Sequence, residues 1–395
     1  MSQKLVGRNP DLKRLRDEGY DLKVVGTHLV IRGIPYVTAA QEIKRGFLLS
    51  TLEMQGDAVK QPEDHTIWFG GECPCNKQGA ALNSIINSRR KEMPAKDISV
   101  DFRFSSKPWG TKRYADYYAK ITTYIKILWH EAQAIDPNVT AQTYPTIPAD
   151  EDDDSPFQYF DTASSRAGIE ALSYKMAMSD LAILGLGGTG AYVLDQVAKT
   201  RVAKIHLYDD DGFSQHNAFR APGAVSLDEI KPDLTKVAYY AQVYAKIHKG
   251  IVPHPYRITA ENAQELAQMK FVFLCLDSGE QKDAIMCALE DAGVPFIDVG
   301  MGLQKVNGAL CGILRATAST PKKRGHVRGN QRISFAPALG PNDYSRNIQV
   351  ADLNSLNAML AVIKWKKLFG FYHDLTGEHH TTYVIETNKL GSEDL

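Results

Sequence analysis

A glycine-rich segment near the middle of the chain constrains its fold more than any other feature. Residues 185–190 read Gly-Leu-Gly-Gly-Thr-Gly, after a short apolar run at residues 181–184 and before a stretch with helical periodicity at residues 191–199. Glycines between a strand and a helix permit a tight turn, and they let backbone amides approach phosphate oxygens closely. The segment therefore predicts a nucleotide-binding turn in an α/β sheet.

Strand-like and helical segments alternate after this loop. A second strand is expected at residues 204–208, and two continuous apolar runs follow at residues 271–276 and 294–299, with helical periodicity between them at residues 281–292. Continuous apolar runs are typical of parallel strands covered on both faces, and their alternation with helices indicates a doubly wound sheet. The predicted fold class is α/β, with a mainly parallel, Rossmann-like sheet.

An acidic run at residues 149–156 marks the clearest break in composition, and the 395 residues suffice for two domains. A run of like charge that ends in proline cannot bury its own surface and predicts a linker. Upstream, three segments alternate like strands and residues 114–134 have helical spacing. We expect an N-terminal α+β domain of unknown role, which could dock a protein partner, over residues 1–148, the linker over residues 149–156, and the second domain over residues 157–395.

The overall composition argues against several classes of function. Forty-six basic residues balance 46 acidic ones, so no global field favours nucleic acid. No apolar run approaches the roughly 18 residues of a membrane span, and five cysteines do not make a disulfide framework. We expect a soluble, cytoplasmic protein that binds neither nucleic acid nor membrane.

Side chains suited to a nucleotide follow the second expected strand. The acidic cluster Asp209, Asp210 and Asp211 stands where a Rossmann-type fold places the carboxylate that binds ribose. Asn217, Arg220 and Lys236 come next in the chain. Convergent positive charge suits a triphosphate and its leaving group better than the pyrophosphate of NAD. These residues favour ATP as the nucleotide.

Asp277 follows the apolar run at residues 271–276, at the edge where parallel sheets bind ligands. Its hard carboxylate oxygen predicts a Mg²⁺ ligand. Each residue also has an ordinary interpretation: Arg220 and Lys236 as solvated surface charges, Asn217 as a turn residue, and Asp277 as a helix N-cap. Their joint order and spacing favours the ATP site.

Taken together, these stretches resemble the ThiF/MoeB and ubiquitin-activating (E1-like) adenylyltransferases, over roughly residues 157–383. The motifs that carry the resemblance are the glycine loop, Asp209-x-Asp211 with Asn217-x-x-Arg220, Lys236, Leu276-Asp277-Ser278 with Lys282, and residues 293–297 with Gly300. The resemblance implies an ATP- and Mg²⁺-dependent enzyme that adenylates the C-terminal carboxylate of a ubiquitin-like protein and acts as a homodimer.

The resemblance also assigns roles to matching positions. The implied ATP-binding residues are Gly185, Gly187, Gly188, Gly190, Asp209, Asp211, Asn217, Arg220, Lys236, Asp277 and Ser278, of which Arg220, Lys236 and Asp277 are catalytic. In the family an arginine from a helix before the first strand reaches into the partner subunit's ATP site, and Arg166 is the best match. Residues 349–366 look like the family's late helix, which packs near the nucleotide.

The chain departs from the longer family members in its cysteines. Those members carry a thioester-forming cysteine in or near the crossover segment, whereas residues 317–346 contain none. Cys73 and Cys75, in the first domain, are candidates for an acceptor thiol, and a turn with incidental cysteines is the alternative. Paired Cys-x-x-Cys ligands are also absent, so we expect no structural zinc.

The sequence leaves the substrate open. The implied partner is a ubiquitin-like protein or a sulfur carrier with a C-terminal glycine, which leads either to a conjugating enzyme or to a thiocarboxylate. An NAD-dependent oxidoreductase is the rival from another enzyme class, and it needs a proton-relay residue that we cannot place. A catalytically silent scaffold is the third hypothesis, against which the set Arg220, Lys236 and Asp277 argues.

Overall fold

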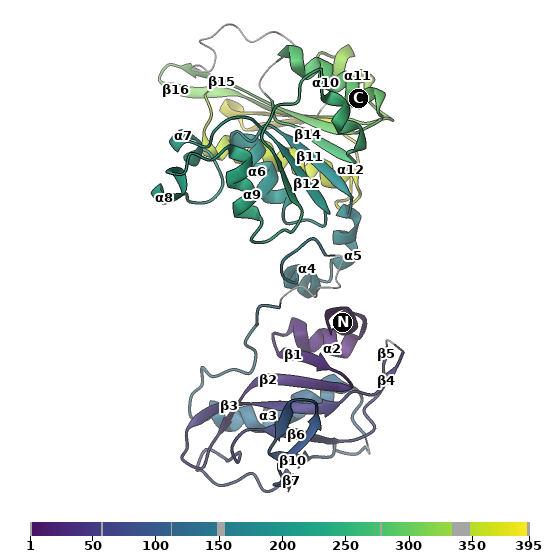
Figure 1. The fold of residues 1–395 in the computed structure, drawn as a ribbon, viewed down its shortest axis with the longest axis vertical. Helices are drawn as coiled ribbons and strands as arrows, with labels where there is room; N and C mark the ends of the chain where they lie inside the picture. Colours follow the sequence, from purple (N-terminus) through teal and green to yellow (C-terminus); the bar gives the residue numbers. More distant parts are fainter. Residues whose placement is uncertain are drawn as a thin grey trace. The chain divides into compact units, whose positions relative to one another are not determined.

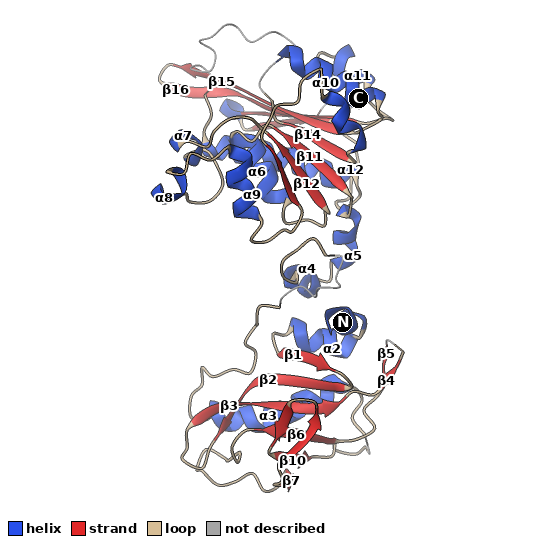
Figure 2. Cartoon of the chain, in the orientation of Figure 1, coloured by secondary structure: helices blue, strands red, loops and turns tan. Residues whose placement is uncertain are grey.

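The computed structural model describes residues 2–56, 58–111, 113–147, 155–276, 279–333 and 348–392. The chain divides into two compact units, one made of residues 1–154 and 159–167 and the other of residues 155–158 and 168–395. Figure 1 labels many of the helices and strands of both units, and Figure 2 distinguishes helices, strands and loops by colour.

The N-terminal unit contains a six-stranded antiparallel sheet with a long helix, α3 (Tyr117–Gln133), on one face. The strand order is β1-β2-β3-β6-β10-β7, and every neighbouring pair is antiparallel. α3 begins at the N-cap Asp116, whose carboxylate accepts a hydrogen bond from the amide of Ala119. Its apolar face, which includes Ile121, Tyr124 and Leu128, packs on the sheet in one core cluster. This packing gives the α+β architecture that the sequence predicts.

The other elements of this unit are α1 (Ser2–Arg8), α2 (Pro10–Asp17), β1 (Asp21–Val25), β2 (His28–Val37), β3 (Ile43–Thr51), β4 (Met54–Gln55), β5 (Ala58–Val59), β6 (Thr66–Gly70), β7 (Ile86–Ser88), β8 (Glu92–Ala95), β9 (Ile98–Val100), β10 (Phe102–Ser105) and α4 (Thr162–Ala167).

The C-terminal unit contains an eight-stranded sheet that is parallel over its first five positions. Its order is β13-β12-β11-β14-β15-β16-β17-β18, and the pairs from β13 to β15 are parallel while those from β15 to β18 are antiparallel. The chain thus runs outward from β11 to β12 and β13, and then crosses back to β14 on the other side of β11. This reversal is the switch point at which doubly wound sheets bind ligands.

The elements of this unit are α5 (Glu170–Ser173), η1 (Tyr174–Met176), β11 (Asp180–Leu184), α6 (Gly188–Val197), β12 (Lys204–Tyr208), α7 (Gln215–Ala218), α8 (Leu227–Ile230), α9 (Lys236–Tyr244), β13 (Ile251–His254), η2 (Ala263–Gln268), β14 (Phe271–Leu274), α10 (Gly279–Asp291), β15 (Phe296–Val306), β16 (Ala309–Ser319), α11 (Gly325–Gly329), α12 (Ala351–Leu368), β17 (His380–Val384), η3 (Ile385–Thr387) and β18 (Lys389–Ser392).

Helices cover both faces of the parallel strands (Figure 2). On one face, Ile183 and Phe273 belong to a core cluster with residues of α6, α9 and α12, such as Trp365. On the other face, Leu184 and Leu274 pack with residues of α10 and η2. The sheet is therefore the middle layer of three, which explains why its central strands read as continuous apolar runs.

The predicted strands and helices of this unit agree with the structure in kind and differ at their ends. The second strand has the predicted bounds, but α6 begins three residues before the expected start at residue 191, inside the glycine segment. β15 runs to Val306 rather than residue 299, because all of its 11 residues pair with the antiparallel strand β16. Only its first residues, 296–298, pair with the parallel strand β14. The antiparallel strands β16 to β18 lack the apolar runs that identified the parallel strands.

The register of the sheet aligns the ends of its central strands. Leu184 pairs with Tyr208 on one side and with Leu274 on the other, and Leu274 pairs with Asp298 of β15. The residues that follow these four positions therefore emerge along one edge of the sheet, the carboxyl edge.

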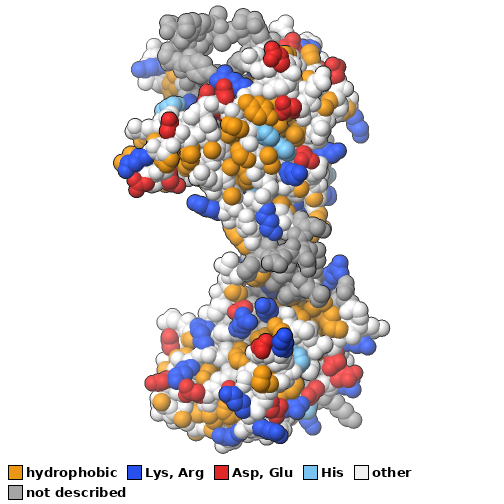
Figure 3. Space-filling model, viewed as in Figure 1, with side chains coloured by type: hydrophobic (Ala, Val, Ile, Leu, Met, Phe, Trp, Pro, Cys, Tyr) orange, Lys and Arg blue, Asp and Glu red, His pale blue; other side chains and the backbone are white. Residues whose placement is uncertain are grey.

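Charged side chains of both signs intermingle on the surface that Figure 3 shows, in line with the zero net charge. Among the described residues, no helix has both the length and the apolar character that a membrane span requires.

Candidate nucleotide-binding site

The glycine segment forms the turn from β11 into α6 at the carboxyl edge. Gly185 has φ +87°, and a Cβ atom there would lie 2.4 Å from the carbonyl oxygen of Cys275. A Cβ atom at Gly190 would lie 1.9 Å from the carbonyl oxygen of Gly185. Both positions thus require glycine, one because its backbone is left-handed and both because the backbone passes so close. The tight turn leaves the first amides of α6 pointing away from the helix, where they suit an anion.

Asp209 fixes this turn from the neighbouring strand. It follows β12 and is 7% exposed, and its Oδ2 accepts a hydrogen bond of 2.6 Å from the amide of Leu186. Its Oδ1 accepts a second bond, 2.9 Å long, from the amide of Asp211. The carboxylate predicted to bind ribose therefore holds the glycine loop in place.

Lys236 begins α9 and points into the same acidic cluster. Its ammonium lies 2.6 Å from Oδ2 of Asp211 and 3.3 Å from Oδ1 of Asp209, and the side chain is almost fully buried. Arg257, from the segment after β13, forms ion pairs with Asp210 and with Asp211. Two cations thus face three carboxylates at the end of β12.

Asp211 is the more exposed of the two carboxylates that Lys236 contacts, with 45% of its side chain exposed against 7% for Asp209. Partial burial raises the pKa of Asp211, but hydrogen bonds and charges from Lys236 and Arg257 outweigh this, so its pKa is lowered. Asp211 is therefore ionised at neutral pH and accessible at the rim of the site.

Asn217 and Arg220 belong to α7 and the residues that follow it. Oδ1 of Asn217 accepts hydrogen bonds from the amide and the hydroxyl of Ser214, which fixes the orientation of the carboxamide. The Nδ2 donor of Asn217 and the Nε donor of Arg220 are buried and have no acceptor among the described residues. A buried donor without an acceptor costs about 1–3 kcal/mol, so these groups suit a ligand rich in acceptor oxygens.

The pKa of His216 indicates that the predicted cations gather in one place. Burial lowers the pKa of this imidazole, and the positive charges of Arg220 and Lys236 lower it further. Both cations therefore lie within electrostatic range of His216. The structure thus brings together the glycine loop, the acidic cluster and the predicted cations.

In the described part of the chain, potential metal ligands lie close together in the acidic cluster Asp209–Asp211. Each of its three residues offers a carboxylate oxygen, and these oxygens lie within 4.8 Å of one another. Lys236 and Arg257 already neutralise these carboxylates. The cluster therefore fits a metal ion poorly. Asp277, the predicted Mg²⁺ ligand, and Ser278 lie outside the described residues.

The remaining predicted residues lie in the N-terminal unit. Arg166 is in α4, and its guanidinium carbon stands 4.9 Å from the ring centre of Tyr144. Cys73 and Cys75 follow β6. Cys75 is buried and its thiol donates to the carbonyl oxygen of Cys73, whereas Cys73 is partly exposed and Nη1 of Arg89 lies 3.5 Å from its Sγ.

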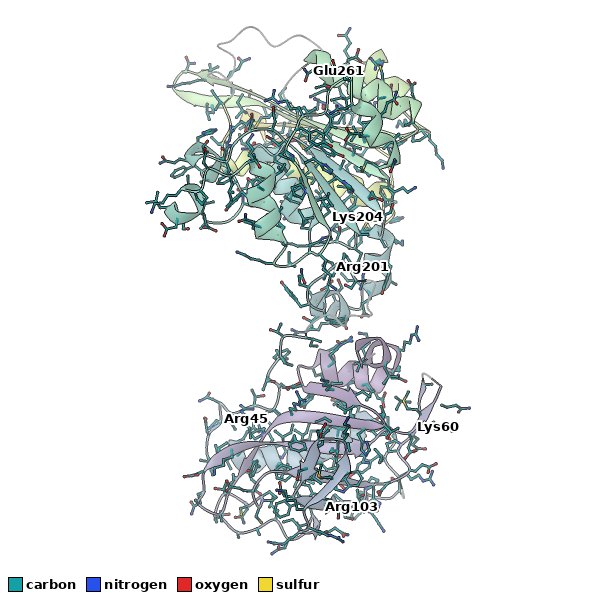
Figure 4. The ribbon with its side chains drawn as sticks, viewed as in Figure 1. Arg45, Lys60, Arg103, Arg201, Lys204 and Glu261 are labelled. Carbon is teal, nitrogen blue, oxygen red and sulfur yellow. The ribbon has the colours of Figure 1, made fainter. Side chains whose placement is uncertain are left out.

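One residue of the site, Arg257, escaped the sequence-based prediction, and a second, Asn354, was expected only as part of the late helix at residues 349–366 that the resemblance implies. Arg257 carries no local motif, although a parallel strand beside β12 necessarily ends at the same edge of the sheet. Asn354 of α12 accepts a hydrogen bond of 3.2 Å from the Thr189 hydroxyl, across 165 positions of sequence. No spacing pattern indicates such a contact. By contrast, Arg201 and Lys204, labelled in Figure 4, lie where β12 begins, at the opposite edge of the sheet.

Comparison with known families and structures separates the two parts of the chain. Residues 10–162 match a domain of unknown function, DUF6791. Residues 163–335 match the ThiF family. No curated protein matches the chain.

Solved structures similar to the chain include PaaA and Escherichia coli MccB. The crystal structure of selenomethionine PaaA is 14% identical, covers 57% of this chain and 75% of its own, and has a TM-score of 0.44. MccB with ATP is 16% identical, with coverages of 59% and 69% and a TM-score of 0.46. The microcin C7 biosynthetic enzyme MccB with N-formylated MccA is 17% identical, with coverages of 59% and 70% and a TM-score of 0.46.

The family match agrees with the resemblance seen in the motifs, and it supports a nucleotide-binding adenylyltransferase with a Rossmann-like sheet. The strand order and the glycine turn at the switch point are the structural counterpart of that match. The C-terminal part of this chain, residues 163–335, is a ThiF-family domain.

Proposed function

We propose that the chain is an E1-like enzyme that uses ATP to adenylate the C-terminal carboxylate of a ubiquitin-like protein. The observation that carries this proposal is the pair of buried donors without acceptors, Nδ2 of Asn217 and Nε of Arg220, in the segment after β12. Arg220 and Lys236 both lie within electrostatic range of His216 in this segment. A triphosphate supplies the acceptor oxygens and the negative charge that this group of donors lacks.

The reaction is an in-line displacement at the α-phosphorus of ATP. A carboxylate oxygen of the protein substrate forms a bond to this phosphorus while the bond to the bridging oxygen of pyrophosphate breaks, which gives an acyl-adenylate and pyrophosphate. Both reactants are anions, so positioning and charge neutralisation by Arg220 and Lys236 supply most of the catalysis. Mg²⁺, when bound, would neutralise further phosphate charge, and Asp277 is the residue proposed to hold it.

Lys236 has to change partners when ATP binds. Its ammonium pairs with Asp209 and Asp211 in this structure, and Asp211 is the accessible member of the pair. We therefore assign the ribose hydroxyls to Asp211, because the carboxylate of Asp209 is committed to the amide of Leu186. Once ribose engages Asp211, the ammonium of Lys236 is free to turn toward the phosphates.

A nucleotide-binding comparison tests the proposal against its rivals. The purified full-length chain should show a larger rise in melting temperature with MgATP than with NAD, and it should catalyse exchange of labelled pyrophosphate into ATP when a ubiquitin-like protein from a neighbouring gene is added. Asp277→Ala should abolish the exchange. Stabilisation by NAD alone would support the oxidoreductase, and the absence of any nucleotide effect would support the silent scaffold.

A thiol in the N-terminal unit is proposed to accept the activated acyl group. The thiolate sulfur of Cys73 would bond to the acyl carbon, and AMP would leave with the electron pair of the broken acyl–phosphate bond. Burial raises the pKa of the Cys75 thiol, whereas Cys73 is partly exposed beside the guanidinium of Arg89. These surroundings favour Cys73 over Cys75, because the acceptor has to form a thiolate and that thiolate has to be accessible to the acyl-adenylate.

The acceptor is tested by trapping the adduct on a non-reducing gel. With ATP and the ubiquitin-like protein, the wild type should form an adduct that dithiothreitol cleaves, and Cys75→Ser should form it equally well. Cys73→Ser should form an ester that resists dithiothreitol. A dithiothreitol-sensitive adduct in the Cys73→Ser variant would rule out Cys73 as the acceptor, and the absence of any adduct despite pyrophosphate exchange would point to a separate conjugating enzyme or to a sulfur carrier.

The oligomeric state remains part of the proposal. Arg166 is assigned to the ATP site of a partner copy, and the enzyme is proposed to act as a homodimer. Mixing an Arg166→Ala chain with an Arg220→Ala chain should restore about a quarter to a half of the wild-type exchange rate per site if the sites are shared, whereas either variant alone should be inactive.

A further inference from the structure

We propose that Asn354, on helix α12, is a phosphate-binding residue of the ATP site, and this inference rests on the proposed function. Asn354 is fully buried. Its Oδ1 accepts a hydrogen bond from the Thr189 hydroxyl, and its Nδ2 donor has no acceptor among the described residues. A polar group in such a position is costly unless a ligand supplies the missing partner.

The free donor lies at the first turn of α6. A Cβ atom built on Gly188 would be 2.0 Å from Nδ2 of Asn354, so this nitrogen stands directly over the first residue of the helix. The residue before the helix, Gly187, offers no side chain to cap it. The first amides of α6, which have no partner within the helix, and the carboxamide donor of Asn354 therefore lie at the same first turn of α6, and an oxyanion bound at this turn would suit both.

The order of the strands identifies the part of the nucleotide that reaches this position. The acidic cluster proposed to bind ribose follows β12, and the glycine loop follows β11, the next strand of the sheet. A nucleotide with its ribose at β12 extends its phosphates along the loop toward α6. Asn354 faces the loop, at the phosphate end of this path, rather than the acidic cluster.

Helix α12 is anchored so that Asn354 keeps this place. One turn along the helix, Nδ2 of Asn357 donates a hydrogen bond of 3.1 Å to the carbonyl oxygen of Gly300 in β15. On the same side, Ala358, Ala361 and Trp365 pack into the core cluster that also contains residues of α6. The donor is thus held in place by the packing of its helix.

The test compares binding of ATP with binding of adenosine, which lacks phosphate, to the full-length chain by calorimetry. Asn354→Asp keeps the shape but replaces the donor with an acidic acceptor, and Asn354→Ala removes the carboxamide. Either change should weaken ATP binding by about tenfold or more, because a hydrogen bond to a charged group is lost, while adenosine affinity should change less than about twofold. Asn307→Asp is the matched control, because it makes the same charge change at the exposed turn between β15 and β16.

Each outcome decides one question. Unchanged ATP affinity in both Asn354 variants would overturn the inference and leave the proposed function standing. Equal losses of affinity for ATP and for adenosine would show that Asn354 supports the fold and does not bind phosphate, which also overturns the inference. If the wild type itself binds no ATP, the proposed function fails rather than this assignment alone. Thermal melts of each variant verify that the C-terminal unit is folded in every measurement.

Discussion

Two groups of buried polar side chains, one in each unit, differ in whether the protein itself supplies their hydrogen-bond partners. In the N-terminal unit, Lys120 is 1% exposed and its ammonium donates to Oγ of Ser50 at 2.9 Å, and Arg16 is 4% exposed and donates to Ser165 and Asp17. In the C-terminal unit, the buried donors of Asn217, Arg220 and Asn354 lack acceptors among the described residues.

This difference distinguishes buried polar groups that stabilise the fold from buried polar groups that suit a ligand. Buried polar groups in natural proteins are nearly always paired, because an unpaired one loses its water without compensation. The pairs of the N-terminal unit already satisfy this rule and need no ligand. Among the unpaired donors of the C-terminal unit, that of Asn354 lies over the glycine turn and those of Asn217 and Arg220 follow β12, whereas that of Trp365 lies in the apolar core. The first three indicate where an acceptor-rich ligand completes the structure. Substitutions in each unit can therefore test the comparison.

The largest expected effect is the loss of activity on removing the guanidinium of Arg220. Arg220→Ala should lower ATP–pyrophosphate exchange by roughly 10²–10³-fold, as for a removed oxyanion donor, and should leave the melting temperature almost unchanged because its Nε has no acceptor to lose. Arg201→Ala is the control, since Arg201 is a cation of the same unit that stacks on Tyr174 before β12. Equal activity of the two variants would refute the role of Arg220.

Alanine substitutions in the glycine turn should destabilise the C-terminal unit to an extent set by the space around each added Cβ atom. A Cβ atom at Gly190 meets the carbonyl oxygen of Gly185, whereas a Cβ atom at Gly187 has no other atom within 4 Å. Gly190→Ala should destabilise the C-terminal unit by about 1–3 kcal/mol through overpacking, and Gly187→Ala by less than about 1 kcal/mol. Urea unfolding of the two variants measures the difference, and equal losses would show that the turn is not as tight as described.

A smaller effect is expected from the buried ammonium of the N-terminal unit. Burial lowers the pKa of Lys120 to about 8, although the charges of Asp64 and Glu53 oppose the shift. The unfolded chain, with the ordinary pKa of 10.5, then binds more protons than the folded one between pH 8 and 10.5. The free energy of unfolding contributed by this residue therefore rises with pH across that window.

Lys120→Met removes the titration and should stabilise the N-terminal unit by about 1–2 kcal/mol at pH 7, since a buried charge is replaced by an apolar chain. The advantage over the wild type should shrink between pH 8 and 10.5. Urea unfolding followed by tryptophan fluorescence reports on this unit, because Trp68, Trp109 and Trp129 belong to it. A pH-independent difference would mean that Lys120 is not a buried, charged group at neutral pH.

The smallest expected effect concerns a paired histidine within the C-terminal unit. His248 is fully buried, its Nε2 donates to the carbonyl oxygen of Val202, and its Nδ1 accepts from the amide of Gly250. Burial lowers the pKa of this imidazole from its ordinary value of 6.5. The unfolded chain therefore binds more protons than the folded chain at acidic pH, so the free energy of unfolding decreases as the pH is lowered below 6.5.

The variant His248→Gln keeps a donor and an acceptor but does not titrate. The fall in melting temperature between pH 7.5 and pH 5.5 should be smaller in this variant than in the wild type, by a few degrees at most. An unchanged fall would assign the acid sensitivity to other groups and remove His248 from the comparison.

Much of the fold and part of the site could be predicted from local sequence patterns. The glycine segment, the apolar runs and the helical periodicity identified β11, α6, β12, β14 and α10, because periodicity depends on neighbours along the chain. Element ends were less accurate: α6 starts inside the glycine segment, and β15 continues into a hairpin with β16 whose far end is mostly exposed and carries no apolar run. The cations Arg220 and Lys236 were predicted from their order after the second strand, and the positive charges of both lower the pKa of His216.

The amino-acid sequence by itself determined the class of fold, the turn that approaches phosphate and the residue types around it, because these follow from short-range spacing and backbone sterics. Only the tertiary structure decided which carboxylate holds the loop, which one stays accessible, and that a carboxamide from α12 lies over Gly188. Those relations join segments up to 165 positions apart, and they arise from strand order and helix packing, which no local pattern encodes.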